Sequence, residues 1–381
     1  MRKSYICIAE VLILSFISVA SAQNVVNNKR CANPNGENGL CIHLEQCTEL
    51  YQMLPKKPLP QANINFLRSS QCGAVNGKVF VCCSDRQMRP SPSISDSIKT
   101  RMGTDTNLPE PGQCGNVRSN RMYGGSITKL DEYPWMALIE YDKGNNLYGH
   151  QCGGSLINKR YVLTAAHCIS QLPQNWKLHR VRLGEWDTST NPDCEVDTRG
   201  IEECADPHVD VTIEQVIPHE KFLKSNRFHD IGLIRLSRNI NYNDFIRPIC
   251  LPLKDSLKRS TFDGIKMDVS GWGKTEQGTP SNVKLKAEVP VVPLYECQRI
   301  YSERSVDLGT SQMCAGGQQG TCTGDSGGPL IGLDSTNKQQ VYYFIAGVVS
   351  FGPTSCGLKD WPTVYTRVSE YVDWIQQNIE P

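Results

Sequence analysis

Three short segments of the chain carry residue types that together can perform nucleophilic catalysis. Ser326 lies in the run Thr-Gly-Asp-Ser-Gly-Gly-Pro, where glycine leaves the backbone amides of Gly324 and Ser326 sterically open. His167 follows a strand-like run, and Asp230 opens an apolar one. A neutral serine hydroxyl is a weak nucleophile, so it needs an imidazole to take its proton, and the imidazolium so formed needs a carboxylate. The two open amides can stabilise an oxyanion.

Each segment also has a simpler interpretation when it is taken alone. A Gly/Ser loop can merely turn the chain, a histidine beside a cysteine is usually structural, and an aspartate at the start of a strand is usually a cap. The order His167, Asp230, Ser326 along one chain, with these flanking residues, is far more specific than any one of the three. The combination predicts acyl-transfer chemistry.

Length and charge limit the classes of protein that fit. The 381 residues are enough for two or three domains with a sizeable core. The 40 basic side chains nearly balance the 39 acidic ones, so the net charge is close to zero. Such a balance gives no electrostatic reason to expect nucleic acid or an anionic membrane as a partner.

The first 22 residues have the order of a secretory signal peptide. Arg2 and Lys3 precede an apolar run at 11–20, which ends in small residues up to Ala22. The alternative is a membrane anchor, but the run is too short to span a bilayer. We therefore expect residues 1–22 to be removed after Ala22 and the mature chain to be secreted and extracellular.

The cysteines fit an oxidising compartment. Of the 17 cysteines, Cys7 would leave with the signal peptide, and the remaining 16 form a group of six from Cys31 to Cys83 and a group of ten from Cys114 onward. An even number in a secreted chain favours disulfides. Zinc binding is disfavoured, because no pair of C-x-x-C knuckles occurs.

Composition divides the chain into segments. Residues 31–83 are compact and cysteine-rich, and 84–121 read as a linker with an activation segment, rich at first in Ser, Pro, Asp and Thr. From 122 to 381, short apolar runs alternate with Gly, Pro and Asn turns, which predicts an all-β body. Within this body only the end has helical spacing, which predicts a terminal amphipathic helix packed on the core through Val368, Tyr371, Val372, Ile375 and Ile379.

Two families resemble these segments. The ordered motifs within 122–381 resemble the chymotrypsin-like serine proteases, and the cysteine spacing of 31–83 with its final Cys82-Cys83 pair resembles the clip domain of arthropod serine proteases. The resemblance implies a double β-barrel with a C-terminal helix, preceded by a small disulfide-rich clip domain. It makes His167 the general base, Asp230 the acid that fixes its tautomer and Ser326 the nucleophile. Gly324 and Ser326 then supply the oxyanion hole.

The resemblance also implies a complete set of disulfides. Cysteine count alone leaves fifteen connectivities open for the clip domain. The families pair the cysteines as Cys31–Cys82, Cys41–Cys72, Cys47–Cys83, Cys114–Cys250, Cys152–Cys168, Cys297–Cys314 and Cys322–Cys356, which leaves Cys194–Cys204.

A basic junction at Arg121 resembles the activation site of these proteases. Cleavage after Arg121 by a trypsin-like enzyme would free the amine of Met122, which would enter the core and pair with Asp325. An unpaired buried carboxylate is strongly unfavourable, so the uncut chain should be a poorly active zymogen. Met122 departs from the Ile or Val common at this position. The alternative is an ordinary exposed loop that contains an arginine.

The substrate cleft matches the family better than the specificity pocket does. Ser350, Phe351 and Gly352 match the strand that binds substrate backbone, whereas the pocket positions are Gly320, Thr321 and Thr363. Trypsin-like members have an aspartate at the place of Gly320, and 315–321 contain no acid. We therefore expect a small or medium P1 residue, or a relaxed preference. Two observations oppose this expectation: many clip proteases are tryptic, and Asp360 could substitute from a neighbouring loop.

The loop at 184–193 could hold calcium. It gathers three carboxylates, and relatives bind calcium in the corresponding loop, which implies Glu185, Asp187 and Asp193 with a carbonyl of Thr190. The alternative is a solvated acidic loop pinned by a disulfide. No cofactor is required for the chemistry itself.

The sequence thus predicts a secreted zymogen serine endopeptidase of an extracellular cascade in innate immunity. The resemblance points to melanization through prophenoloxidase, or to processing of a Toll ligand, in haemolymph. Expected partners are protein substrates such as a downstream zymogen or cytokine precursor, an upstream activating protease and serpin inhibitors, with no nucleic acid and no membrane. The alternative is a catalytically inactive clip-domain cofactor or binding protein of such a cascade.

Overall fold

A computed structural model describes the chain in two units. The described residues are 30–44, 47, 50, 61–75, 78–84, 108–116, 126–196, 199–225, 227–273, 279–317, 326–353 and 360–380. The units are Met1–Gly103 and Thr104–Pro381. The predicted signal peptide, 1–22, lies outside the described residues. No helix of the described part is long and apolar enough to cross a membrane.

The first unit contains an antiparallel sheet and a helix. The strand order is β1-β2-β4-β3, with β1 (Arg30–Ala32), β2 (Asn38–His43), β3 (Gln71–Val75) and β4 (Lys78–Ser84), and the helix is α3 (Gln61–Ser69). Its disulfides are Cys31–Cys82, Cys41–Cys72 and Cys47–Cys83, the pairing that the clip resemblance implied. The core around Leu50 and Val81 is small, so cross-links of about 2–4 kcal/mol each contribute much of the stability.

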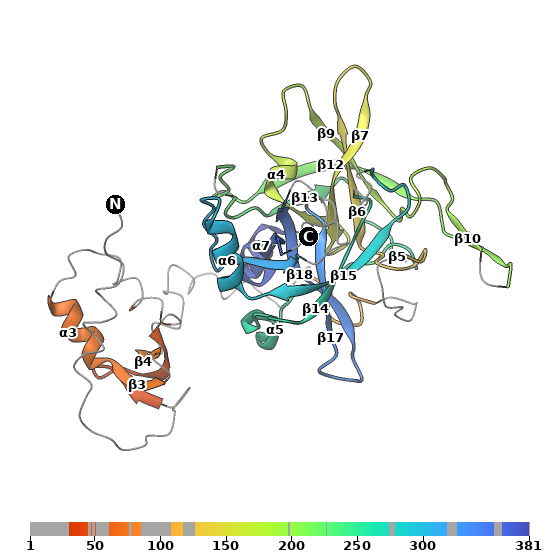
Figure 1. Ribbon diagram of the computed structural model, residues 1–381. Coiled ribbons are helices and arrows are strands. Elements are labelled where there is room, and N and C mark those ends of the chain that lie inside the picture. The colour runs from red at the N-terminus through yellow and green to blue at the C-terminus, as the bar shows by residue number, and fades with distance from the viewer. Residues whose placement is uncertain are drawn as a thin grey trace. The chain divides into compact units, whose positions relative to one another are not determined.

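The second unit begins with a closed antiparallel barrel (Figure 1). Its strands are β6 (Met136–Asp142), β7 (Tyr148–Leu156), β8 (Tyr161–Thr164), β9 (Lys177–Leu183), β12 (Val209–Pro218) and β13 (Gly232–Leu236). They are ordered β12-β13-β8-β7-β6-β9. A two-stranded ribbon, β10 (Cys194–Val196) with β11 (Glu202–Cys204), extends away from the barrel and is closed by Cys194–Cys204.

Six further strands form a second barrel. They are β14 (Lys266–Gly271), β15 (Leu285–Val292), β16 (Gln312–Gly316), β17 (Pro329–Asp334), β18 (Tyr342–Phe351) and β19 (Pro362–Arg367). The order β14-β17-β18-β19-β16-β15 closes because β14 also pairs with β15, and the short strand β5 (Ser126–Ile127) adds to β15. The predicted all-β double barrel is therefore confirmed.

The helices are short and the last one completes the core. They are α4 (Ala166–Ile169), α5 (Asp255–Arg259), α6 (Leu294–Ser302) and α7 (Val372–Asn378). The predicted terminal helix begins with a 3-10 turn, Val368–Tyr371, before α7. Val368, Tyr371 and Ile375 join the core of the first barrel, so the predicted apolar stripe is buried.

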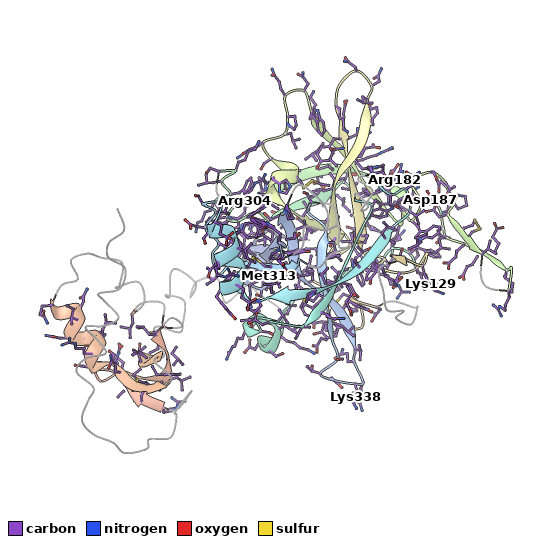
Figure 2. The ribbon with its side chains drawn as sticks, viewed as in Figure 1. Lys129, Arg182, Asp187, Arg304, Met313 and Lys338 are labelled. Atoms are coloured by element: carbon purple, nitrogen blue, oxygen red, sulfur yellow. A yellow bond between two sulfur atoms is a disulfide. The ribbon has the colours of Figure 1, made fainter. Side chains whose placement is uncertain are left out.

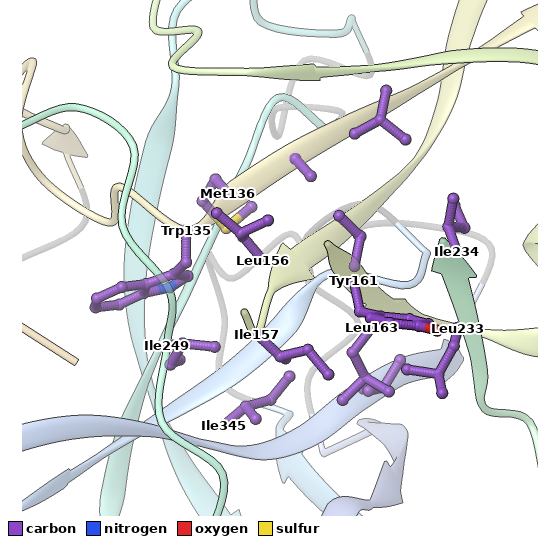
Figure 3. Close-up of a cluster of buried hydrophobic side chains, with 14 of the residues drawn as sticks. Trp135, Met136, Leu156, Ile157, Tyr161, Leu163, Leu233, Ile234, Ile249 and Ile345 are labelled. Carbon is purple, nitrogen blue, oxygen red and sulfur yellow. The ribbon is translucent and has the colours of Figure 1, made fainter. Parts of the chain in front are cut away.

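Large apolar side chains fill the first barrel. Trp135, Tyr161, Leu163, Ile249 and Ile345 are fully buried and meet in one cluster, although they come from distant parts of the sequence (Figure 3). Ile345 belongs to β18 of the second barrel, so the cluster continues from one barrel to the other. Full burial of such a side chain contributes about 1.5–3 kcal/mol. This rigid body supports the loops that carry the candidate catalytic residues.

Part of the predicted linker belongs to the second unit. Cys114 is joined to Cys250, the Gly115 amide donates to the carbonyl of Pro248 over 2.9 Å, and the Tyr343 amide donates to the carbonyl of Gly115, also over 2.9 Å. Gly115 has a φ of 69°, and a β-carbon there would clash with the Tyr343 backbone. Residues around Cys114 are therefore fixed to the body by covalent and backbone bonds.

Candidate active site

His167 is presented by a strand that ends beside it. The Asn158 side-chain oxygen accepts hydrogen bonds from the amides of Arg160, at 2.8 Å, and Tyr161, at 2.7 Å, which turns the chain into β8. After β8 the chain enters the one-turn helix α4, which contains His167 between the buried Ala166 and Cys168. The imidazole is 19% exposed, so one edge of the ring faces the surface.

The carboxylate of Asp230 is fully buried and meets three donors. The His167 amide donates to Oδ1 at 2.9 Å, His167 Nδ1 lies 2.8 Å from Oδ2, and the Ser350 hydroxyl donates to Oδ2 at 2.5 Å. A proton on Nδ1 satisfies this geometry and leaves Nε2 of His167 as the acceptor. The arrangement therefore fixes the tautomer that a general base needs.

Hydrogen bonds from the C-terminal part of the chain hold the backbone around Asp230. Thr366 Oγ1 donates to the Asp230 carbonyl over 2.7 Å. The preceding residue, His229, adopts a φ of 56°, and its Nδ1 lies 3.0 Å from the Tyr371 hydroxyl. His229 also stacks on His219 with ring centroids 4.8 Å apart, and burial lowers the pKa of both imidazoles. The Asp230 segment is thus held by Thr366 of β19 and by Tyr371 of the C-terminal 3-10 turn.

Ser326 lies next to His167. The Cys168 sulfur is 3.6 Å from His167 Nε2 and 3.6 Å from the Ser326 carbonyl oxygen. Since Cys168 is bonded to Cys152, this sulfur has no hydrogen to donate and marks proximity alone. The Ser326 carbonyl accepts a hydrogen bond from the Gly153 amide over 2.8 Å. The structure thus brings the three predicted residues, His167, Asp230 and Ser326, to one place.

Two of these contacts were not predicted from the sequence. Ser350 was assigned to substrate binding alone, yet its hydroxyl contacts Asp230, and Thr366 was not singled out at all. Their roles depend on which strands meet in the second barrel, for which a single sequence carries no local signal.

Several predicted residues lie outside the described part of the chain. They are Arg121, Met122, Gly320, Thr321, Cys322, Gly324, Asp325 and Cys356. Their predicted roles in activation, in the oxyanion hole, in the pocket and in the eighth disulfide remain predictions. The other seven predicted disulfides are formed.

Two protein families match the chain in the same two segments. Residues 122–375 match the family described as Trypsin, which is about two thirds of the chain. The chain belongs to the trypsin family. Residues 31–83 match the family described as Regulatory CLIP domain of proteinases. The resemblance drawn from the motifs is therefore confirmed, and the chain combines a CLIP domain with a trypsin-family domain.

Similar proteins align with this chain over almost their whole length. Serine protease ea of Drosophila melanogaster is 56% identical, over 94% of this chain and 93% of that protein. Melanization protease 1 of the same organism is 46% identical, over 92% of each. A crystal structure of the Drosophila Grass clip serine protease of the Toll pathway covers 92% of this chain and 97% of its own, at a TM-score of 0.64 and 35% identity.

The acidic loop of this trypsin-family domain contains two buried carboxylates. Glu185 is 2% exposed and Asp193 is 4% exposed, and burial together with Asp193 raises the pKa of Glu185 to about 7. Asp193 Oδ2 accepts the amides of Trp186, at 2.9 Å, and Asp187, at 3.0 Å, while Thr190 Oγ1 donates to Oδ1 at 2.6 Å. The four predicted ligand residues therefore belong to one tightly hydrogen-bonded loop.

Arg182 of β9 offsets part of the negative charge of this loop. Arg182 Nη1 lies 3.1 Å from Glu185 Oε2, and its Nε lies 2.8 Å from Asp210. Figure 2 labels both Arg182 and Asp187 on the side of the unit from which β10 extends in Figure 1. The Asp187 carboxylate accepts from the Ser189 amide and hydroxyl, at 3.0 and 2.6 Å. The oxygens of these acids already accept hydrogen bonds within the loop, and oxygen is the type of ligand that a hard cation such as calcium prefers.

In the described part of the chain, the compact groups of metal-ligating residues lie outside this loop, and they do not form metal sites. Among the described residues, the compact His, Cys, Asp and Glu groups are Cys152 with His167 and Cys168, and Cys194 with Glu202 and Cys204. Both groups contain a disulfide, whose sulfurs are not thiolates.

The described pocket positions lie on β18, directly after it and on β19, and of these Ser350 contacts Asp230. Ser350 and Thr363 are buried, Phe351 is half-buried and Gly352 is exposed. Asp360, the acid that could have substituted for the missing aspartate, is exposed, and its amide donates to the Gly317 carbonyl over 2.8 Å. Its side chain therefore has the solvent-facing environment of a turn residue.

Proposed function

We propose that this chain is the zymogen of a secreted serine endopeptidase that cleaves peptide bonds through Ser326, His167 and Asp230. The observation that carries the proposal is the buried Asp230 carboxylate, 2.8 Å from His167 Nδ1, with Ser326 adjacent. Trypsin-family membership supports the same chemistry. A structural histidine would not need a buried acid and a neighbouring serine in this arrangement.

The proposed reaction uses the hydrogen bond between Asp230 and His167 as part of a proton relay. Ser326 Oγ attacks the carbonyl carbon of the scissile peptide, and its proton passes to Nε2 of His167. Asp230 stabilises the resulting imidazolium through the Nδ1 hydrogen bond. His167 then gives the proton to the leaving amine, and water hydrolyses the acyl-enzyme by the same route in reverse. The amides of Gly324 and Ser326 receive the oxyanion.

Activation is proposed to follow cleavage after Arg121. The new amine of Met122 would pair with Asp325, directly before the nucleophile, and so order the oxyanion loop. The Cys114–Cys250 disulfide supports this scheme, because Cys114 precedes Arg121 in the sequence and the bond reaches the catalytic body. The severed N-terminal part would then stay attached.

Calcium is proposed as a structural ion of the 184–193 loop. Glu185 and Asp193 would be its buried carboxylate ligands, with Asp187 and the Thr190 carbonyl completing the set. The ion would neutralise two like charges that Arg182 offsets only in part. The ion would take no part in peptide cleavage, which requires no metal ion.

The relatives suggest an extracellular cascade of innate immunity. Among them are proteins named melanization protease 1, Spaetzle-processing enzyme and phenoloxidase-activating factor 1. We infer protein substrates, such as a downstream zymogen or a cytokine precursor, an upstream activating protease and control by serpins in haemolymph. The clip domain would be the docking module for such partners.

A fluorophosphonate label on Ser326 tests the proposal. We expect labelling of the chain cut after Arg121, little labelling of the uncut chain and none of the Ser326→Ala variant. Peptide hydrolysis should fall on the order of 10⁴-fold or more in that variant. If the cut wild-type chain takes no label, the chain is instead an inactive clip-domain cofactor.

A further inference from the structure

Two stacked imidazoles lie next to the buried acid of the triad. The ring of His229, the residue before Asp230, lies 4.8 Å from the ring of His219 between centroids, and the two ring planes are 11° apart. His229 has a φ of 56°, in the left-handed region that residues other than glycine adopt only rarely. A contact that fixes the His229 ring therefore also helps to fix the backbone from which Asp230 follows.

His219 contacts the chain on both sides of Asp230. Its imidazole stacks on His229, which precedes the acid, and its amide donates to the carbonyl of Ile231, which follows the acid, over 3.0 Å. The amide of Ile231 in turn donates to the His229 carbonyl over 2.9 Å, so the backbone closes a three-residue turn with Asp230 at its centre. One residue, directly after β12, thus holds both sides of the turn that carries the acid.

The neutral form of the His219 ring fits this position. The residue is 7% exposed, and its ring packs against His229 and against Trp374, whose ring centroid is 5.0 Å away. Its Nδ1 accepts a hydrogen bond from the amide of Lys221 over 3.1 Å, so the proton of the neutral ring is on Nε2. Burial lowers the pKa of both His219 and His229. The stacked pair is therefore uncharged at neutral pH.

A second proton on His219 would break this arrangement. That proton has to go to Nδ1, which can then no longer accept a hydrogen bond from the Lys221 amide. The carboxylate of Glu220 lies 3.7 Å from the same nitrogen and is 65% exposed, so it attracts the charged ring toward solvent. The cation of Lys221 repels the charged ring. Protonation thus favours a ring that has turned out of the stack on His229.

Other titratable groups surround the pair. The Tyr371 hydroxyl lies 3.0 Å from His229 Nδ1, and the Tyr371 ring meets both imidazoles edge-on. Among the described acids, Glu220 is the one that makes an ion-pair contact with His219. The remaining titratable side chains of neighbouring elements are His167 of α4, Lys224 and Arg227 of the loop before His229, Asp230 itself, and Glu370 and Asp373 of the C-terminal segment.

We propose that His219 is a positioning residue for Asp230, and that it holds this acid only as a neutral ring stacked on His229. This inference rests on the proposed protease activity. Acid then weakens the triad through two separate protons, one on His167 and one on His219. The proton on His167 removes the general base, whereas the proton on His219 acts through the turn around Asp230 and touches no reacting atom.

Two substitutions separate the ring of His219 from its hydrogen-bond acceptor. His219→Phe keeps a stacking ring that cannot take a proton, and the amide of the exposed Lys221 can then bond to water. His219→Asn keeps an acceptor for the amide two residues on, but it has no ring. The full chain is cut after Arg121 with an immobilised trypsin-like enzyme, which is then removed. Hydrolysis of an internally quenched peptide library is measured from about pH 8 to about pH 4.5, on both sides of the ordinary pKa of histidine.

The three enzymes should differ in their pH profiles. At pH 8 we expect kcat/KM of His219→Phe to lie within about 2-fold of wild type and that of His219→Asn to be about 2- to 10-fold lower, the effect of one aromatic pair. In acid, wild type should fall to the level of His219→Asn, because its ring leaves the stack, while His219→Phe stays above both. Protonation of His167 is common to the three enzymes and cancels in these ratios. His179→Gln, which changes an exposed histidine of β9, is the control and should follow wild type.

Backbone hydrogen exchange tests the same point without catalysis. In the full-length Ser326→Ala chain, residues 229–232 should be protected at pH 8, and they should stay equally protected when His219→Phe is added. Protection should fall when His219→Asn is added instead. Lowering the pH should remove the extra protection from the chain that keeps His219 and leave it in the chain with His219→Phe.

Two results would overturn the inference. One is equal activity and equal exchange in His219→Phe and His219→Asn, and the other is a ratio of wild type to His219→Phe that does not change with pH. Failure of the proposed activity gives a different result. If the cut wild-type chain is inactive at every pH while the exchange pattern is as expected, the proposed activity is wrong and the positioning role of His219 stands.

Discussion

The amide of Gly153 donates a hydrogen bond to the carbonyl of Ser326 over 2.8 Å, which joins β7 of the first barrel to the nucleophile segment that leads into β17 of the second. The next residue, Gly327, adopts a φ of 81°, and its amide bonds to Val349. A β-carbon at Gly327 would approach the Gly153 carbonyl to 2.6 Å and clash with Thr164. A contact between the two barrels thus positions Ser326, and this contact leaves room only for glycine at position 327.

Gly327→Ala should therefore damage both stability and activity. Strain at a positive φ costs about 1–3 kcal/mol, and the clash with β7 and β8 adds to it. We expect a lower free energy of unfolding in urea and a drop in hydrolysis by the cut enzyme.

Gly264→Ala is the matched control for Gly327→Ala. Gly264 has a φ of 75°, but a β-carbon there meets nothing within 4 Å. It should show the backbone strain alone and keep full activity. Equal effects of the two substitutions would mean that the contact between the barrels does not position the serine.

Ser350 and Thr366 offer a second comparison around Asp230. Ser350→Ala removes a hydrogen bond to a buried carboxylate, worth about 1.5–3 kcal/mol, whereas Thr366→Val removes one to a neutral carbonyl, worth about 0.5–1.5 kcal/mol. We expect the larger loss of unfolding free energy, and of kcat, in Ser350→Ala. A larger effect of Thr366→Val on kcat would show that the Ser350 hydroxyl does not support the acid.

The disulfide Cys114–Cys250 makes a covalent prediction. After cleavage at Arg121, the wild-type chain should run as one band on a non-reducing gel and as two bands after reduction. The double variant Cys114→Ser, Cys250→Ser should separate into two bands without reduction. A single band for that variant would mean that another covalent bond holds the N-terminal part.

Calcium should stabilise the enzyme without being needed for the chemical step. An ion present at about 100 times its Kd adds about 2.7 kcal/mol, which corresponds to an increase of several degrees in Tm. Chelator should reverse this increase in wild type.

Asp187→Asn should weaken the calcium effect, because it removes the charge of a proposed ligand. The variant should still fold, because Asp187 is only half-buried and not part of the core. Asp255→Asn, an exposed acid on α5, is the control and should respond to calcium as wild type does. A wild-type Tm that is unaffected by calcium and chelator would contradict the proposed site.

Local chemistry was predictable from the sequence, and long-range contacts were not. Residue types and order singled out His167, Asp230 and Ser326, and the helical spacing from Val368 marked the C-terminal element. The helix Gln61–Ser69 was missed because its apolar residues are few and interrupted by asparagines. The close packing of Thr363 against Gly352 depends on the pairing of β18 with β19. Position 363 was recognised from the resemblance, but its contact with Gly352 could not be predicted from one sequence. Disulfide connectivity likewise came from the resemblance, because sixteen cysteines alone leave it open.

A buried lysine makes a prediction about pH. Lys284 is 3% exposed, and burial lowers its pKa to about 8, against the opposing effect of Glu132 and Glu185. A folded-state pKa below the unfolded value of 10.5 means that the charged form is disfavoured in the fold. This group therefore lowers stability most below pH 8, and the loss disappears as pH rises from about 8 to 10.5. The difference in pKa corresponds to about 3 kcal/mol as an upper bound.

Lys284→Met should accordingly raise the free energy of unfolding at pH 7, and its advantage over wild type should shrink between pH 8 and 10.5. Urea denaturation at a series of pH values, with chelator present throughout, measures the difference in unfolding free energy between the variant and wild type. The titration of other groups cancels in this difference. Lys286→Met is the control, because Lys286 pairs with Glu132 at 2.6 Å and the substitution breaks that ion pair. That variant should be less stable than wild type at pH 7. If Lys284→Met is also less stable there, the attraction of Lys284 to the surrounding acids outweighs its burial.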